Sequence, residues 1–277
     1  MSTNKKYRCV NCGKPCSALY RTYGKSVLKL TKCAICKGIV DKYIEYDPVI
    51  VMIDLVLVSK EAQRHILYNT DFKAYWKLFI ILTMLETYAV WRSDSLFSIA
   101  VNTICDVNSI NTVNSTKINI PFSLPESWIS SCRGWIQEGR GDDTDLFIWE
   151  KDFYVQFLST LSGIIIFIAT THVLMEMIQS VGTRSKGSVG VGRLLRAFSL
   201  SASGGAFSLA ALVWGASAAR SLHYALVALY AFVVFGNVFS VVYETPTYLT
   251  MLALVVSNTA KCYTTFHMTP FLRGFIS

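Results

Sequence analysis

Four cysteines near the start of the chain form two Cys-x-x-Cys pairs, Cys9/Cys12 and Cys33/Cys36. Two such pairs, with twenty residues between them, are typical of a four-cysteine zinc site. Four thiolates complete the tetrahedral shell of the metal and leave no position for a substrate, so we expect a structural zinc ion. The pairs could instead form a redox dithiol or remain plain thiols, and Cys16 could replace Cys12 as a ligand.

The residues between the two pairs can position them as a hairpin. Residues 17–22 and 26–31 have the alternating pattern of short strands, and a glycine-containing turn joins them. Gly13 and Gly38 closely follow the two cysteine pairs and can adopt the tight backbone turn around a bound metal. We therefore expect residues 1–47 to form a small zinc-ribbon domain with a β-hairpin, which folds only when the metal is bound.

The composition of the chain is that of a membrane protein. Of 277 residues, 52% are hydrophobic and 16% are charged, and the mean hydropathy is +0.40. Soluble domains carry about 25% charged residues, so we expect an α-helical polytopic membrane protein with a small N-terminal ribbon. The predicted spans are residues 72–92, and then, within a bundle over 153–277, residues 153–178, 194–214 and 222–243. Residues 247–260 could be a fifth span, a re-entrant segment or a surface helix.

The segment after the ribbon reads as a helix that is too short to span a membrane. Asp47-Pro48 is a typical helix start, with the acid as N-cap and proline in the first turn. An apolar stretch over 49–58 is followed by polar residues, so we expect residues 48–71 to form an amphipathic helix at the membrane surface. The alternative is a core helix that packs against the ribbon.

Charge predicts the orientation of these elements. Residues 1–77 hold 14 Lys and Arg against 6 Asp and Glu, whereas residues 93–150 hold 3 against 8. Basic segments stay in the cytosol, so we expect a cytosolic N-terminus, which also lacks a signal-peptide pattern, and a lumenal loop over 93–152. Asn114 lies in an Asn-x-Ser/Thr acceptor sequence for glycosylation in that loop, and Cys105 and Cys132 could pair there.

Three ionisable residues within apolar segments are the only candidates for chemistry inside the membrane. Glu86 lies in the first predicted span, and His172 and Glu176 lie one helical turn apart in the second. An intramembrane enzyme could use all three, but no nucleophile with a base and no open metal motif accompanies them, so we expect no enzyme. Attachment to a membrane also makes a nucleic-acid partner unexpected.

The two cysteine pairs are accompanied by the motifs Val27-Leu-Lys-Leu-Thr31 and Val40-Asp-Lys-Tyr-Ile-Glu-Tyr-Asp47-Pro-Val-Ile-Val. By these motifs, and above all by the second, the opening stretch resembles the Arv family of endoplasmic-reticulum membrane proteins. The resemblance continues in Arg64-His65-Ile-Leu-Tyr-Asn69-Thr70 and covers about residues 7–70. At Glu61-Ala-Gln63 the chain departs from the Gln-Ala-Tyr-like run expected in the family.

The resemblance implies a role in lipid homeostasis: sterol transport, sphingolipid balance and early assembly of glycosylphosphatidylinositol (GPI) anchors. The implied partners are membrane lipids, namely sterols, GPI precursors and anionic headgroups, together with GPI-anchor transferases. The implied location is the endoplasmic-reticulum membrane, with the Golgi membrane as a further one. A scaffold that recruits lipid-synthesising enzymes without binding lipid is the alternative. Either role needs a cytosolic contact surface, and we expect it in the tract after the metal: Asp41, Lys42, Tyr43, Glu45, Tyr46, Arg64 and His65.

Overall fold

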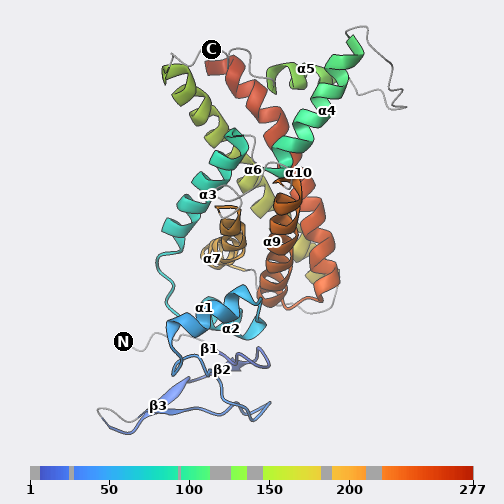
Figure 1. Cartoon of the computed structure of the whole chain (residues 1–277). Coiled ribbons are helices and arrows are strands. Elements are labelled where there is room, and N and C mark those ends of the chain that lie inside the picture. Colours follow the sequence, from blue (N-terminus) through green and yellow to red (C-terminus); the bar gives the residue numbers. More distant parts are fainter. Residues whose placement is uncertain are drawn as a thin grey trace. The chain divides into compact units, whose positions relative to one another are not determined.

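The structure is a computed structural model that describes residues 7–24, 28–92, 95–112, 126–135, 146–181, 189–209 and 220–276. The described part is mostly helical, and its strands are confined to the N-terminal segment, coloured blue in Figure 1. The chain divides into two compact units. The first comprises residues 1–79, 175–204 and 230–252, and the second comprises residues 80–174, 205–229 and 253–277.

The first unit begins with two short antiparallel hairpins. β1 (Tyr7–Arg8) pairs with β2 (Pro15–Cys16), and β3 (Tyr20–Thr22) pairs with β4 (Leu28–Leu30). The second hairpin is the predicted one, and the first was not expected. A small core of Cys9, Leu19, Cys33 and Val40 lies between the hairpins, so two of the thiols are among its most buried groups.

Short helices follow the hairpins in the first unit. α1 (Pro48–Val56) begins as predicted, because the Asp47 carboxylate accepts a hydrogen bond from the Val49 N–H at 3.2 Å. α2 (Lys60–Arg64) then widens into η1 (His65–Asn69), one turn of π-helix. The predicted single helix over 48–71 is therefore broken at residues 57–59, where Val58 has a positive φ of 59°.

The remainder of the first unit comes from distant parts of the sequence. α7 (Val191–Ala202) contacts η1, and aromatic rings along α9 (Arg220–Tyr243) stack at Phe235, Phe239 and Tyr243. Phe198 of α7 packs against Phe235 with ring centroids 5.7 Å apart. The N-terminal module is thus in one unit with the end of an apolar helix more than 170 residues later.

The second unit is built from helices. It contains most of α3 (Tyr75–Trp91), α4 (Leu96–Thr112), α5 (Glu126–Trp135), much of α6 (Leu146–Val181) and the later part of α10 (Thr247–Ile276). The segment 93–152, predicted as a lumenal loop, contains helical structure, because α4, α5 and the start of α6 lie within it. Their apolar side chains pack on α10, as described below.

Two described helical segments are long and apolar enough to cross a membrane, Trp149–Ser180 and Leu222–Tyr243. They coincide with the predicted spans at 153–178 and 222–243. Helix α3, at the predicted first span, has 17 residues. The predicted span at 194–214 begins in α7, which gives way to a short 3-10 helix, Ser203–Phe207, at its paired glycines; residues 210–219 lie outside the described part. The segment predicted at 247–260 is part of α10, which has 30 residues.

Candidate functional site

The two hairpins bring the four predicted cysteines together. The Sγ atoms of Cys9, Cys12, Cys33 and Cys36 all lie within 4.8 Å of one another. Those of Cys9 and Cys36 are 3.7 Å apart, as are those of Cys12 and Cys33. A tetrahedron with metal–sulfur bonds of about 2.3 Å has sulfur–sulfur edges of about 3.8 Å, so this cluster could hold a metal ion.

The backbone folds back at each pair in the same way. The Gly13 N–H donates to the Cys9 carbonyl at 2.8 Å, and the Lys37 N–H donates to the Cys33 carbonyl at 3.0 Å. Both Gly13 and Lys37 have positive φ, 73° and 58°. The expected glycine turn is therefore present in the first pair, but in the second pair Lys37 takes the left-handed position that we assigned to Gly38.

Cys16 lies beside the cluster but outside the group of four. Its Sγ faces the Lys14 carbonyl at 3.7 Å, and burial is the main cause that raises the pKa of its thiol to about 11. Within the group of four, backbone N–H groups of Cys36 and Ile35 lower the pKa of Cys33 to about 6. Burial raises the pKa of Cys9 to about 12. Metal binding at this cluster must therefore displace a proton from Cys9.

Behind the cluster, Asp41 is fully buried and ties three segments together. Its Oδ1 accepts a hydrogen bond from the Tyr43 N–H at 3.0 Å. Its Oδ2 lies 2.7 Å from His65 Nδ1 and 2.6 Å from Asn69 Nδ2. Asn69 in turn exchanges two hydrogen bonds with the backbone of Arg8, at 2.9 and 2.8 Å. This network connects β1, the segment after the second cysteine pair and the π-helical turn.

Most of the predicted contact surface is therefore internal to the first unit. Tyr43 is buried, and its hydroxyl donates to Asp54 Oδ2 at 2.7 Å. Arg64 uses Nη1 to donate to the Val10 and Asn11 carbonyls, at 2.6 and 2.8 Å. Lys42 forms an ion pair with Glu61, and Asp41 and His65 contact each other through Oδ2 and Nδ1.

Only Glu45 and Tyr46 of the predicted surface are exposed. Apolar side chains that follow them form a larger exposed surface on α1, which the sequence assigned to a membrane-surface helix. Val51 is the buried residue of this helix. The exposed apolar face of α1, which includes Leu57 directly after the helix, consists of Val49, Ile50, Met52, Ile53, Val56 and Leu57. The Val56 carbonyl accepts a hydrogen bond from the Tyr230 hydroxyl of α9 at 2.8 Å.

Glu86, the carboxyl predicted within a span, has a cationic partner. It forms an ion pair with Lys261 of α10, within the second unit. Helix α10 thus continues past residue 260, where the apolar pattern ends, and Lys261 has a counter-charge there. His172 and Glu176 both lie half-buried on α6. Asn114 lies outside the described residues.

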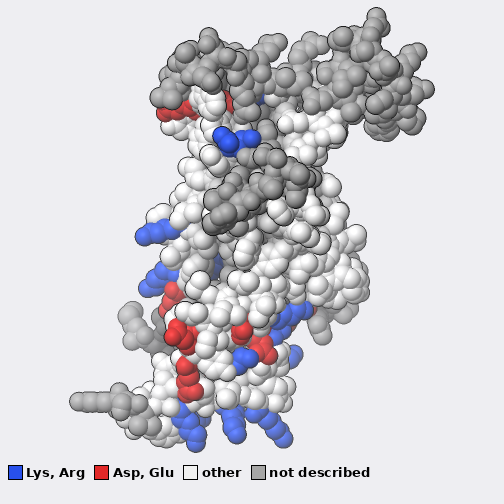
Figure 2. All heavy atoms as spheres, in the orientation of Figure 1, with Lys and Arg blue, Asp and Glu red and all other residues white. Residues whose placement is uncertain are grey.

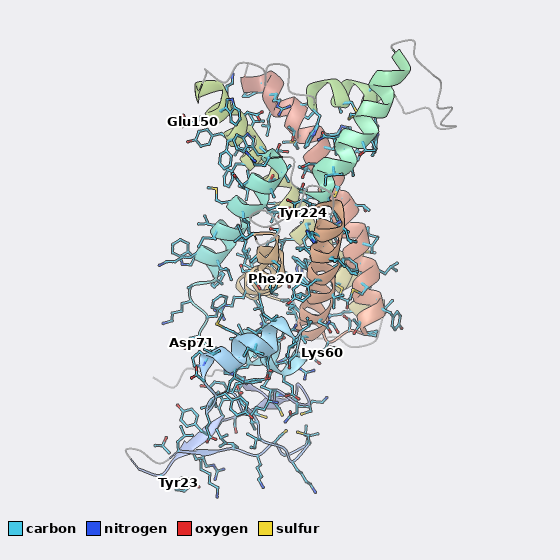
Figure 3. All side chains as sticks on the ribbon, in the orientation of Figure 1. Tyr23, Lys60, Asp71, Glu150, Phe207 and Tyr224 are labelled. Carbon is cyan, nitrogen blue, oxygen red and sulfur yellow. A yellow bond between two sulfur atoms is a disulfide. The ribbon has the colours of Figure 1, made fainter. Side chains whose placement is uncertain are left out.

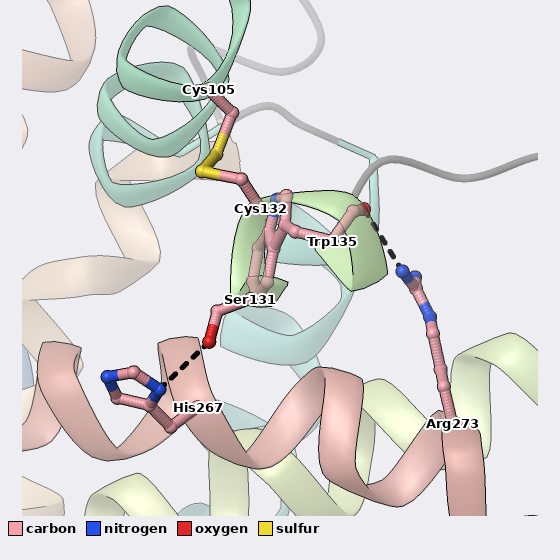
Figure 4. Close-up of a disulfide and its surroundings, with 6 residues drawn as sticks. All are labelled: Cys105, Ser131, Cys132, Trp135, His267 and Arg273. Carbon is pink, nitrogen blue, oxygen red and sulfur yellow. Dashed lines mark hydrogen bonds between the residues drawn. A yellow bond between two sulfur atoms is a disulfide. The ribbon is translucent and has the colours of Figure 1, made fainter. Parts of the chain in front are cut away.

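Cys105 and Cys132 form a disulfide between α4 and α5, with Cα atoms 5.4 Å apart (Figure 4). Around it, Val101 of α4 and Trp128 of α5 pack with Phe266 of α10 in a core cluster. The disulfide therefore anchors two helices that composition alone had assigned to a loop.

Two polar contacts next to the disulfide were missed by sequence reasoning. The Ser131 hydroxyl lies 3.0 Å from His267 Nδ1, and Arg273 donates to the Trp135 carbonyl at 3.0 Å (Figure 4). Arg273 also binds Asp152 of α6. The spacing of Trp128, Cys132 and Trp135, with intervals of four and three residues, was the helical signal available in the sequence.

Comparison with known proteins gives a family match. The model of the Arv1-like family matches residues 8–241. The human protein named Protein ARV1 is 46% identical over 90 residues, which cover 32% of this chain and 33% of the human one. Protein arv1 homolog of Dictyostelium discoideum is 38% identical over 93 residues, 30% of this chain and 38% of that protein. Protein ARV1 of Saccharomyces cerevisiae is 41% identical over 61 residues, 22% of this chain and 19% of the yeast protein.

The aligned part thus spans about a third of the length of the human relative. No solved structure matches the chain. The family match extends well beyond the cysteine pairs, as far as residue 241 near the end of α9.

Proposed function

Since the chain belongs to the Arv1-like family, we propose that it mediates lipid homeostasis in the endoplasmic-reticulum membrane. Its roles would be sterol transport and distribution, sphingolipid balance and early GPI-anchor assembly. It would act by binding or presenting lipids, as a polytopic membrane protein that catalyses no reaction.

The exposed apolar face of α1 is the observation that carries this proposal. Six large apolar side chains on one short helix segment are exposed, with Met52 at 64% and Leu57 at 71%. Burying such side chains in lipid is favourable by about 1 kcal/mol or more each. The hydrogen bond from Tyr230 holds the end of this helix against α9, within the segment Leu222–Tyr243 that is apolar enough to span. Helix α1 would therefore lie in the cytosolic leaflet, where it could contact sterols and lipid precursors.

The four-thiol cluster would bind zinc in a structural role. Its four sulfur atoms match the preference of zinc for four-coordinate thiolate sites, and a complete shell leaves no position for a substrate. Zinc would hold both hairpins in place and thereby fix the segment that leads from Cys36 through Asp41 to α1. The chain's contribution to lipid handling would thus depend on the metal without involving chemistry at it.

The two kinds of cysteine site support the proposed orientation. Metal-binding thiols need a reducing compartment, whereas the Cys105–Cys132 disulfide needs an oxidising one. The hairpins would therefore face the cytosol, and α4 and α5 would face the lumen of the endoplasmic reticulum, with the Golgi as a further location. Glycan attachment at Asn114, detected as a mobility shift that glycosidase reverses and Asn114→Gln abolishes, tests this orientation.

A scaffold for GPI-anchor transferases is the second candidate. Exposed basic side chains on the hairpins favour it, since they offer a contact surface separate from α1: Lys14, Arg21, Lys29, Lys32 and Lys37. Figure 2 shows Lys and Arg side chains gathered along this part of the molecule. Transferase subunits that co-purify with the chain, in the absence of any lipid crosslink, would favour this second function.

Photocrosslinking in cells that lack their own relative of this protein tests the first function. The variant Met52→Glu/Leu57→Glu places two charges on the apolar face of α1. Tyr23→Glu is the matched control, since Tyr23 is 65% exposed on a hairpin turn. The wild type and the control should restore sterol distribution and crosslink to photoactivatable sterol or GPI precursor, whereas the α1 variant should do neither and still retain its metal. Full restoration by the α1 variant, or no crosslink to the wild type, would contradict the proposal.

A further inference from the structure

A pocket of about 340 Å³ lies within the first unit, next to the metal cluster. Four segments line it: Arg8 of β1, the turn from Cys12 to Lys14, α2 and η1 with Lys60, Arg64 and Tyr68, and the end of α9 with the residues after it, between Ser240 and Thr245. Its volume is within the range of small-molecule sites, about 300–1,000 Å³. The hairpins and the helices thus enclose a site that neither could form alone.

The lining of the pocket is strongly basic. It contains four cationic side chains, Arg8, Lys14, Lys60 and Arg64, and one carboxylate, Glu244. Cations gathered in a cleft attract an anion and hold it with charge-assisted hydrogen bonds. The expected ligand is therefore negatively charged and rich in acceptor oxygens.

Two of these cations have structural roles, and two are available to a ligand. Arg8 is paired with Glu244 and lies over the Tyr68 ring, and Arg64 binds the Val10 and Asn11 carbonyls. Among the residues that the structure describes, no carboxylate is paired with Lys14 or Lys60. Lys60, labelled in Figure 3, has its Nζ 3.4 Å from the Thr247 hydroxyl.

The position of the pocket along α9 indicates what kind of anion it meets. The apolar segment of this helix runs from Leu222 to Tyr243, and the pocket lies at its end, between Ser240 and Thr245. In a helix that crosses a bilayer, the end of the apolar segment lies at the depth of the lipid headgroups. Phosphate is the anionic group common to those headgroups.

We infer that this pocket binds a phosphate group, presented by the headgroup of a phospholipid or a phosphorylated lipid precursor, with Lys14 and Lys60 as its principal ligands. The inference rests on the proposed lipid function and names the part of the lipid that the chain recognises. Free inorganic phosphate has the same chemistry, so the experiment includes it separately.

Binding to the full chain in neutral detergent tests the pocket. The probes are water-soluble dihexanoyl phosphatidic acid, inorganic phosphate and the uncharged dihexanoyl diacylglycerol, each titrated by calorimetry. The pocket variant is Lys14→Glu/Lys60→Glu, and the matched control is Lys29→Glu/Lys32→Glu, which makes the same charge change on exposed hairpin positions outside the pocket. Lys60→Gln provides a milder second variant in case the double reversal impairs folding, which metal content would reveal.

Phosphatidic acid should bind saturably to the wild type and the control, and diacylglycerol should not bind. The pocket variant should bind phosphatidic acid at least about tenfold more weakly, as expected for losing a charge-assisted contact. If inorganic phosphate binds with the same affinity as phosphatidic acid, the site is assigned to the free ion. Absence of saturable binding by either phosphate, or equal weakening in the control, would overturn the inference. If the wild type restores sterol distribution in cells but binds no phosphate, the pocket assignment fails and the lipid function stands. If the wild type binds phosphate but does not restore sterol distribution, the lipid function fails and the pocket assignment stands.

Discussion

Asp41 Oδ2 lies 2.7 Å from His65 Nδ1, in a site where the aspartate side chain is completely buried. The two residues come from opposite ends of the segment between the metal cluster and the first long helix. Asn69 joins them and extends the network to the backbone of β1. This carboxylate therefore helps to attach the cysteine-bearing hairpins to the helices of the first unit, together with the hydrogen bonds from Arg64 to the Val10 and Asn11 carbonyls.

Asp41→Asn should destabilise the protein, because a neutral amide cannot accept all the hydrogen bonds that the carboxylate accepts. We expect a loss of about 2 kcal/mol, which corresponds to a fall in melting temperature of roughly 5 °C. Glu45→Gln makes the same change of carboxylate to amide at an exposed position and should have no effect. Thermal unfolding of the full chain in detergent provides the measurement, and equal melting temperatures for both variants would contradict the role assigned to Asp41.

Each of the four clustered cysteines should be required for full metal content. Serine at Cys9, Cys12, Cys33 or Cys36 should lower the zinc stoichiometry of the purified chain, whereas Cys16→Ser should leave it unchanged. Elemental analysis of the five variants checks this. Full zinc retention in all four ligand variants would eliminate the cluster as a metal site.

Metal affinity should also fall as the pH falls. In the metal-free cluster, Cys33 is a thiolate above about pH 6 and Cys9 is protonated up to about pH 12. Binding therefore releases the Cys9 proton throughout this range, and below pH 6 it must also displace a proton from Cys33. Competition with a chelating dye from pH 8 to pH 5 should show steeper metal loss below pH 6. An affinity independent of pH would contradict this order of proton release.

Gln63→Leu should stabilise the first unit. Gln63 is 1% exposed, and neither side-chain amide atom has a hydrogen-bond partner among the described residues. Removing a buried, unsatisfied amide should raise stability by about 1 kcal/mol. The control is Gln179→Leu, because Gln179 Nε2 donates to the Tyr243 carbonyl at 2.6 Å and its loss should lower stability. Melting temperatures that shift in the same direction for both variants would refute this interpretation.

Every substitution that removes the disulfide should lower the free energy of unfolding by the same amount. Cys105→Ser, Cys132→Ser and the double variant should each lose about 3.5 kcal/mol, since all three open the same loop of 27 residues. Cys262→Ser, at a free cysteine, provides the control. Maleimide labelling of the denatured wild type should count two more thiols after reduction than before it. A double variant clearly less stable than either single one would indicate separate roles for the two cysteines.

The sequence predicts the clustering of the four cysteines and the start of α1 well because both depend on local rules. Paired cysteines need only a tight turn and a hairpin to converge, and Asp47-Pro48 caps whatever helix follows it. The burial of residues in the predicted contact surface does not follow from local rules. Asp41 and Tyr43 are polar residues in a polar stretch, yet they are buried by partners at His65 and Asp54 that composition could not identify.

Helices α4 and α5 lie in a region whose helices the sequence does not indicate. The region is rich in Asn, Ser and Asp, which have low helix propensity, so composition indicates a loop. Tertiary contacts override that preference, because the disulfide and the packing of Trp128 on Phe266 stabilise helices that are only partly apolar. The ion pair between Lys261 of α10 and Glu86 of α3 is likewise a tertiary contact that composition could not identify.

The packing of Tyr68 against the end of α9 also has a consequence for synthesis of the chain. The Tyr68 hydroxyl donates to the Val241 and Val242 carbonyls, which are made 173 and 174 residues later. At about 5–20 residues per second, the ribosome takes on the order of ten to thirty seconds to cover that interval. During this time the hairpins lack the end of α9, which completes the first unit. If the cysteine cluster binds zinc as proposed, early metal capture would keep the nascent hairpins folded in the meantime, and limited zinc supply should affect the newly made protein before the mature one.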